Sequence, residues 1–129
     1  MPKRSPKSNE PQTGRFAYEG LERSMHEKAR LGIMTSLLTH REGLTFVDLK
    51  QLCELTDGNL SRHLDVLQEE GLIIQQKQTG PGRATTLCQL SPLGRKRFLE
   101  YIEALQRVVA DASEAAKKHA ATASRLGFS

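Results

Sequence analysis

The sequence predicts a mainly helical fold that carries a small two-stranded β-ribbon and ends in one long helix. Apolar residues recur at helical spacing in three short segments between residues 25 and 70. Two runs with strand character then flank a Gly-Pro-Gly sequence at residues 80–82, which is typical of a hairpin turn. An amphipathic stretch follows, from Pro92 to about His119. The chain of 129 residues therefore fits one small domain with tails.

The first helix is predicted to begin after Ser24, because Ser24 and Glu27 have the spacing of a capping box. Residues 41–43 end it. Its apolar positions recur at helical spacing, with Ile33 beside them: Leu31, Met34, Leu37 and Leu38.

The second helix follows a short strand at residues 44–46, and Thr45 with Asp48 forms a second capping box at its start. A tight turn at Glu54 and Leu55 leads to the third helix, for which Thr56 is the predicted N-cap. Gly71 ends that helix at C′. The buried face of the second helix is predicted at Phe46, Leu49, Leu52 and Cys53, and that of the third at Leu60, Leu64 and Leu67.

The ribbon is predicted from Leu72 to Leu90, with Thr85–Leu90 as its second strand and Pro81 and Gly82 at the centre of a type II turn. Ser91 and Pro92 then start the last helix as N-cap and first residue. Two helices joined by a tight turn and followed by a hairpin form a winged helix-turn-helix.

The third helix has the features of a DNA recognition helix. Its outward face carries polar donors near the N-terminus and acidic residues toward the C-terminus, and recognition helices contact base edges with their N-terminal residues. Arg62 could make a bidentate contact to guanine, and Asn59 could make one to adenine. Gly58 is explained either by close approach of a DNA backbone or by its place in the first helical turn, where glycine costs less.

Basic residues suggest a polyanionic partner. The first fifteen residues hold four cationic side chains and one acidic side chain, and the stretch 75–97 contains no acid. A solvated charged surface is the alternative interpretation.

We divide the chain into a disordered basic tail (1–15), a winged-helix domain (16–119, with the last helix from about 91) and a flexible tail (120–129). Phe16, Tyr18 and Leu21 predict a short helix or an ordered arm before the first helix.

Other classes of protein are disfavoured. No catalytic triad, carboxylate pair or phosphate-binding loop stands out, so we expect no enzyme and no cofactor. Cys53 and Cys88 form no CxxC motif, so we expect no metal site and read both as core residues. His63 is expected beside the core, hydrogen-bonded to the backbone. No apolar run is long enough to span a membrane. The two scattered cysteines fit a reducing cytoplasm, where we expect the protein to lie.

The segment Thr56–Leu64, followed by Leu67 and residues 70–72, resembles the recognition helix and strand of winged-helix regulators related to the MarR and ArsR groups. It is most similar to the short subfamily that ends in one long helix, and the resemblance covers about Met25 to Leu105. It implies a dimeric DNA-binding regulator without the metal-binding cysteines of arsenic-type sensors. Carried over by position, the resemblance implies DNA contacts at Thr56, Asn59, Ser61, Arg62, Lys77 and Arg83. We add Gly58 to this set because a DNA backbone could approach it closely.

The last helix favours a homodimer independently of the resemblance. Its apolar residues follow a heptad spacing of four, three, four, three and four: Phe98, Ile102, Leu105, Val109, Ala112 and Ala116. The second half of this seam has no partner within the chain, and we expect the arm around Phe16 and Tyr18 to assist the dimer. A single amphipathic helix lying on its own domain is the alternative.

The sequence therefore favours a homodimeric regulator that binds specific double-stranded DNA, with repression as the expected effect. The alternative is a winged helix used as a protein-interaction module without specific DNA binding. The near-neutral charge outside the tail and the wing keeps that alternative open, and salt-dependent DNA binding distinguishes the two. A small-molecule effector is compatible with either reading, and no residue indicates its chemistry.

Overall fold

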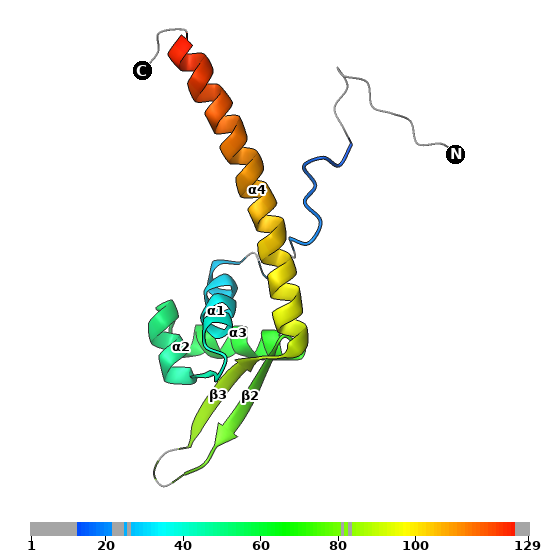
Figure 1. Cartoon of the computed structure of the whole chain (residues 1–129). Helices are drawn as coiled ribbons and strands as arrows, with labels where there is room; N and C mark the ends of the chain where they lie inside the picture. The colour runs from blue at the N-terminus through cyan, green and yellow to red at the C-terminus, as the bar shows by residue number, and fades with distance from the viewer. Residues whose placement is uncertain (1–12, 22–24, 26, 81, 83, 126–129) are drawn as a thin grey trace, which may run out of the picture.

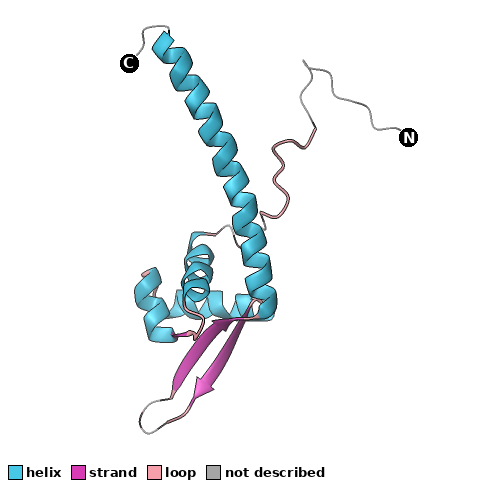
Figure 2. Ribbon diagram, viewed as in Figure 1, coloured by secondary structure: helices cyan, strands magenta, loops and turns pink. Residues whose placement is uncertain are grey.

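The computed structural model describes residues 13–21, 25, 27–80, 82 and 84–125, and it has the element order that the sequence predicts. A compact group of helices lies beside a small sheet, the wing projects from one side, and α4 rises from the domain as a long stem (Figures 1 and 2). The elements are α1 (Lys28–Thr39), β1 (Leu44–Thr45), α2 (Phe46–Cys53), α3 (Asp57–Glu69), β2 (Ile73–Gln78), β3 (Thr85–Leu90) and α4 (Pro92–Arg125).

The predicted caps of α2 and α3 are confirmed. The Thr45 hydroxyl accepts a hydrogen bond from the Asp48 backbone N–H at 3.1 Å, and the Thr56 hydroxyl accepts one from Asn59 at 3.2 Å. Gly71 has a φ of 79° at the end of α3. Its N–H and that of Leu72 bond back to carbonyls of the last helical turn, which completes a Schellman motif.

The sheet contains three antiparallel strands in the order β1-β3-β2. The sequence predicts the ribbon of β2 and β3 and the short first strand, but not that this strand joins the ribbon. Leu44 pairs with Cys88, so β1 closes the inner edge of the wing and ties it to the start of α2. This pairing leaves the outer half of the wing free to project from the domain (Figure 2).

The core lies where α1, α3, the base of the wing and the start of α4 meet. The predicted stripe of α3, Leu60, Leu64 and Leu67, is fully buried there. Cys88 is also fully buried and Cys53 is partly buried, and both are free thiols. The core cluster also includes Met25, Ile33, Met34, Leu37, Leu49, Leu72, Ile73, Phe98 and Tyr101.

The junction between β3 and α4 fixes the direction of the stem. The Ser91 hydroxyl caps α4 by accepting a hydrogen bond from the Gly94 N–H at 2.9 Å, as the sequence predicts. The same hydroxyl donates to the Gly71 carbonyl, and the Ser91 N–H donates to the Leu72 carbonyl at 3.0 Å. One buried serine thus joins the end of α3, the start of β2 and the start of α4.

Three local predictions are corrected by the structure. Helix α1 begins at Lys28 rather than at Met25, and its N-cap is Glu27, whose side chain makes no capping bond. Ser24, the predicted cap, lies outside the described residues. Leu52 is 56% exposed because it lies at the rim of α2, facing a groove beside α1 rather than the core. Helix α4 continues to Arg125, beyond the predicted end at about His119.

In the structure, the first part of the predicted heptad seam of α4 is covered by its own domain and the second part is exposed. Phe98 is fully buried in the core of its own domain, so its assignment to a dimer interface is wrong. Ile102 and Leu105 are partly buried against the same core, so the domain itself covers the first half of the seam. Val109 is 57% exposed, and Ala112 and Ala116 are exposed. The unpartnered part of the seam therefore begins at Val109.

Within the described ranges, each helix is too short or too polar to cross a membrane.

Gly94 is predicted to be essential for the junction. A Cβ atom at this position would lie 1.8 Å from the Leu72 carbonyl oxygen, and that oxygen is held by the Ser91 bond. We expect Gly94→Ala to lower the free energy of unfolding by about 3 kcal/mol, because backbone must move to admit the methyl group. Gly58→Ala is the matched control, since nothing lies within 4 Å of its Cβ position. Urea unfolding of both variants decides the point, and equal stabilities would contradict the prediction.

Candidate nucleic-acid interface

The N-terminal half of α3 presents a polar face to solvent on the side opposite its buried leucines. Gly58, Asn59, Ser61 and Arg62 are all exposed, as is the cap Thr56. The Arg62 guanidinium donates to the Asn59 side-chain oxygen at 3.2 Å, one turn away on the same face. The two side chains predicted to contact bases are therefore neighbours, and they lie at the helix N-terminus.

The tight turn between α2 and α3 is held by backbone geometry and by one ion pair. Glu54 ends α2 in the left-handed conformation, with a φ of 50°, which turns the chain sharply toward α3. The Lys50 ammonium lies 2.8 Å from the Asp57 carboxylate, so the end of α2 is tied to the start of α3. Both side chains are largely exposed, so we assign this pair an orienting role rather than a large contribution to stability.

His63 anchors the inner side of α3. It is 6% exposed, as expected of a core-flanking histidine. Its partners are side chains rather than the predicted backbone groups: Nδ1 accepts from the Arg30 Nε–H at 3.4 Å, and Nε2 lies 3.4 Å from a Glu27 carboxylate oxygen. This arrangement links α3 to the first residues of α1.

The wing places Lys77 near its outer end, exposed and paired across the ladder with Thr86. Gly82 has a φ of 113°, the left-handed conformation that the predicted turn requires at this position. Pro81 and Arg83, the other predicted residues of the wing tip, lie outside the described residues. The wing and the outward face of α3 thus both present exposed polar or charged side chains.

The start of α3 combines hydrogen-bond donors with a positive charge. Donors and a cation gather at the start of α3, and the exposed acids Asp65 and Glu69 lie one and two turns further along it. Burial raises the pKa of the Cys88 thiol to about 11, so this thiol stays protonated at neutral pH. Within the described part of the chain, no group of three His, Cys, Asp or Glu residues could hold a metal ion.

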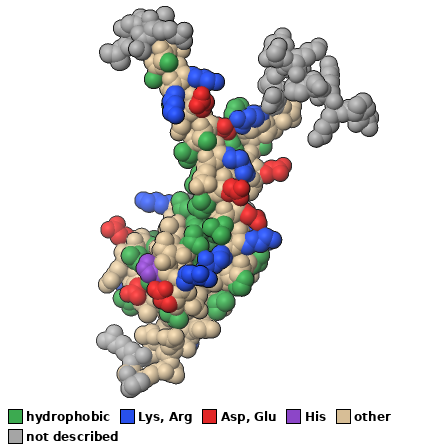
Figure 3. Space-filling model, viewed as in Figure 1, with side chains coloured by type: hydrophobic (Ala, Val, Ile, Leu, Met, Phe, Trp, Pro, Cys, Tyr) green, Lys and Arg blue, Asp and Glu red, His purple; other side chains and the backbone are tan. Residues whose placement is uncertain are grey.

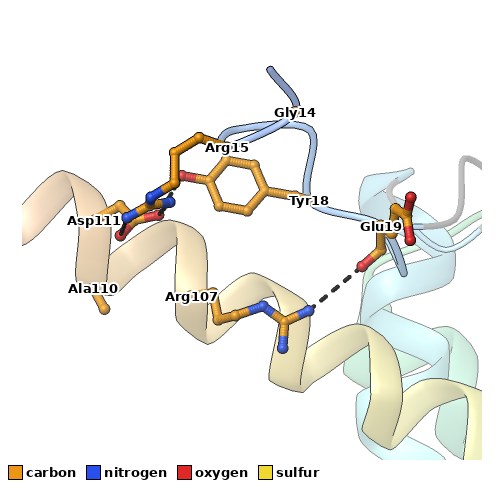
Figure 4. A pocket seen from close by; sticks show the side chains of 7 residues that line it. All are labelled: Gly14, Arg15, Tyr18, Glu19, Arg107, Ala110 and Asp111. Carbon is orange, nitrogen blue, oxygen red and sulfur yellow. Dashed lines mark hydrogen bonds and ion pairs between the residues drawn. The ribbon is translucent and has the colours of Figure 1, made fainter. Parts of the chain in front are cut away.

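A second polar cluster joins the arm before α1 to the stem, and sequence reasoning missed it. Arg15 donates two hydrogen bonds to the Asp111 carboxylate, at 2.9 and 3.0 Å, and the Tyr18 hydroxyl donates a third at 2.6 Å (Figure 4). Arg15 also lies over the Phe16 ring, 4.7 Å from its centroid. We call Arg15, Tyr18 and Asp111 the latch.

The latch changes the predicted boundary of the domain. Arg15, assigned to the disordered tail, is instead held on α4, and the described arm begins at Thr13. Figure 4 shows the arm folded over α4, with Arg107 reaching toward the Glu19 backbone from the same side. Because Arg15 and Asp111 are 96 residues apart, no local sequence pattern announces their pairing.

Comparison with known proteins agrees with this geometry. A family model described as "Winged helix DNA-binding domain" matches residues 29–109. The uncharacterized protein MJ0432 of Methanocaldococcus jannaschii is 40% identical over 67 residues, which cover 52% of this chain and 73% of that protein. The chain therefore belongs to the winged helix DNA-binding domain family.

Solved structures share the fold. A transcriptional regulator homologue of Pyrococcus horikoshii OT3 is 28% identical with a TM-score of 0.65, over 69% of this chain and 87% of that one. MepR of S. aureus, solved as a DNA complex, has a TM-score of 0.63 at 19% identity, over 84% and 87%. The MarR family regulator SP03579 has a TM-score of 0.61 at 23% identity, over 86% and 75%. These likenesses confirm the winged-helix fold that the sequence resemblance implies.

The hydrogen bonds of the latch should persist at acidic pH. Hydrogen bonds from Arg15 and then Tyr18 hold the pKa of Asp111 at about 2, below its ordinary value of 3.8. Because this pKa is lowered in the folded state, the latch is complete above pH 3.8 and is lost as the pH falls toward 2. An NMR titration of the Tyr18 ring signals should show one transition near pH 2. A transition near pH 4 would contradict the prediction.

Asp111→Asn should release the arm at neutral pH, because the amide has no negative charge and keeps only one of the two oxygens that accept from Arg15. We expect trypsin to cleave after Arg15 faster than in the wild type. Glu114→Gln, which makes the same charge change at an exposed position one turn further along α4, should leave the cleavage rate unchanged.

Proposed function

We propose that this protein is a cytoplasmic, homodimeric repressor of transcription that binds specific double-stranded DNA through α3 and the wing. The observation that carries the proposal is the exposed face at the start of α3, where Asn59, Ser61 and Arg62 have no packing role. Recognition helices of this fold contact base edges with their N-terminal residues. The fold likeness to MepR, whose structure is a DNA complex, supports the same docking mode.

Direct readout would come from α3. Arg62 can donate two hydrogen bonds to the O6 and N7 atoms of guanine, and Asn59 can contact adenine at N6 and N7. The Arg62–Asn59 hydrogen bond holds the two side chains together before DNA arrives. The acids further along α3 disfavour phosphates at that end, so the helix would enter the major groove with its N-terminus first.

The wing would supply contacts that do not read sequence. Lys77 is exposed on β2, and Arg83 follows the turn in the sequence, with no acid between residues 75 and 97. Cations in this position would bind a phosphate or the minor groove, and each phosphate contact contributes to the salt dependence of binding.

The homodimer would be formed by the part of α4 that leaves the domain. In the face drawn in Figure 3, hydrophobic side chains gather around the base of the stem, and the stem itself carries both hydrophobic and charged side chains. Val109, Ala112 and Ala116 continue the heptad seam beyond Leu105 and are exposed in the single chain. A two-fold partner would bury both copies of this stripe and place two recognition helices on a palindromic site.

Arg62→Ala should weaken binding to the specific site by roughly 1 to 3 kcal/mol and relax the preference at one base pair, because a bidentate base contact is lost. The site is first selected from random duplexes, and binding is then titrated over a range of salt concentrations. Lys117→Ala, which removes a cation from the exposed stem, is the matched control.

Two outcomes would contradict the proposed DNA function. Unchanged affinity and base preference in Arg62→Ala would remove Arg62 from the interface. A wild-type protein that shows no salt-dependent DNA binding would favour the protein-interaction module instead. The repressor assignment is tested by a reporter promoter that carries the selected site, where added protein should lower transcription.

A double change of Val109 and Ala112 to Glu should produce monomers with intact secondary structure. Burial of the two Val109 side chains alone is worth on the order of 3 kcal/mol, so the dimer dissociation constant should rise on the order of 100-fold or more. Ala121→Glu, at an exposed position off the heptad seam, is the matched control and should remain a dimer. Sedimentation equilibrium measures both, and a wild-type protein that is monomeric at micromolar concentration would overturn the homodimer.

A further inference from the structure

A polar contact joins the wing to the recognition helix. The Gln75 side-chain amide on β2 donates to the Gln68 side-chain oxygen at 2.7 Å and to an Asp65 carboxylate oxygen at 3.5 Å. Asp65 and Gln68 are one turn apart on α3, so one side chain of the wing contacts the same edge of the helix twice. We call Asp65, Gln68 and Gln75 the clip.

The position of Gln75 on its strand is unusual for a polar residue. Alternate residues of a strand share a face, so Ile73, Gln75 and Lys77 point to the same side of the ribbon. Ile73 is buried in the core, Gln75 is half-buried and Lys77 is exposed. An apolar side chain at residue 75 would continue the core outward, whereas the amide makes directional bonds that specify one arrangement of wing and helix.

The clip lies between the residues to which the proposed function assigns DNA contacts. Asp65 follows Arg62 by one helical turn on the exposed face of α3, and Lys77 follows Gln75 by two residues on the same face of the wing. Any change in the angle between α3 and β2 would therefore alter the spacing between Arg62 and Lys77.

We propose that Gln75 is a positioning residue, which sets the wing against α3 so that Arg62 and Lys77 reach one DNA duplex together. This inference rests on the proposed DNA-binding function.

The test compares Gln75→Met with Gln76→Met. Methionine keeps the length of the side chain but lacks the amide donor, and Gln76 is exposed on the opposite face of the same strand. We expect Gln75→Met to weaken binding to the specific site roughly 3- to 10-fold, the effect of one lost hydrogen bond. Gln76→Met should change it less than about twofold, the range of a neutral surface substitution. Thermal unfolding of both variants measures any general loss of stability.

A double-mutant cycle separates positioning from a merely structural role. If Gln75 acts through Lys77, then Lys77→Ala should cost less affinity in the Gln75→Met background than in the wild type. The salt slope should fall with Lys77→Ala in the wild type, by about one unit, and should fall less in the Gln75→Met background. Additive losses, or equal effects of the two methionine variants, would overturn the proposal.

The hydrogen bonds of the clip can also be measured without DNA. This measurement distinguishes an error in the clip from an error in the proposed function. In the free protein, the Gln75 side-chain amide protons should exchange with water more slowly than those of Gln76. If the wild type binds no DNA although this protection is observed, the proposed function fails and the positioning role fails with it. If DNA binding is intact and the Gln75 amide exchanges as fast as that of Gln76, only the clip is wrong.

Discussion

The arrangement of the whole molecule depends on the contact between Gly94 and the Leu72 carbonyl. The absence of a side chain at Gly94 lets the first turn of α4 lie directly on the backbone that joins α3 to β2. Ser91 then satisfies that backbone with both its N–H and its hydroxyl group. A buried backbone carbonyl needs such a partner, so the contact is both sterically and electrostatically specific. The directions of α3, the wing and the stem are all set within a few residues of this point.

This constraint connects the two proposed activities of the protein. DNA recognition is assigned to the exposed start of α3, and assembly to the exposed part of α4 beyond Leu105. Both helices meet at the junction of Gly71 and Ser91, where hydrogen bonds of Ser91 join α3 to the stem in one frame. In a two-fold dimer the spacing of the two recognition helices would follow from this frame rather than from any flexible linker.

Polar contacts at the surface orient the helices and the arm further. Glu27 and Arg30 hold the inner side of α3 through His63, and Lys50 holds the start of the helix through Asp57. The latch fastens the arm to the stem in the same way. The first two contacts join elements that the hydrophobic core already brings together, whereas the latch joins the arm to α4 beyond the core. Each adds the direction that apolar packing lacks.

The sequence by itself determined the fold class, the order of the elements and most of their ends. These features depend on local chemistry: Thr45, Thr56 and Ser91 cap their own helices, and the leucine stripe of α3 needs only the helical period to be recognised. The exposed face of α3 follows from the same period. The family resemblance rests on these same local features.

Tertiary structure alone decided which surfaces remain free. The heptad pattern of α4 is continuous, yet Phe98 is covered by its own domain and Val109 is not, because coverage depends on where the neighbouring elements end. Leu52 fits the apolar pattern of α2 and is nonetheless exposed for the same reason. The latch and the clip could not be predicted from the sequence, because Asp111 contacts Arg15 and Gln75 contacts Gln68 only after the chain has folded. Local pattern specifies which elements form, but contacts between residues distant in sequence exist only in the packed chain.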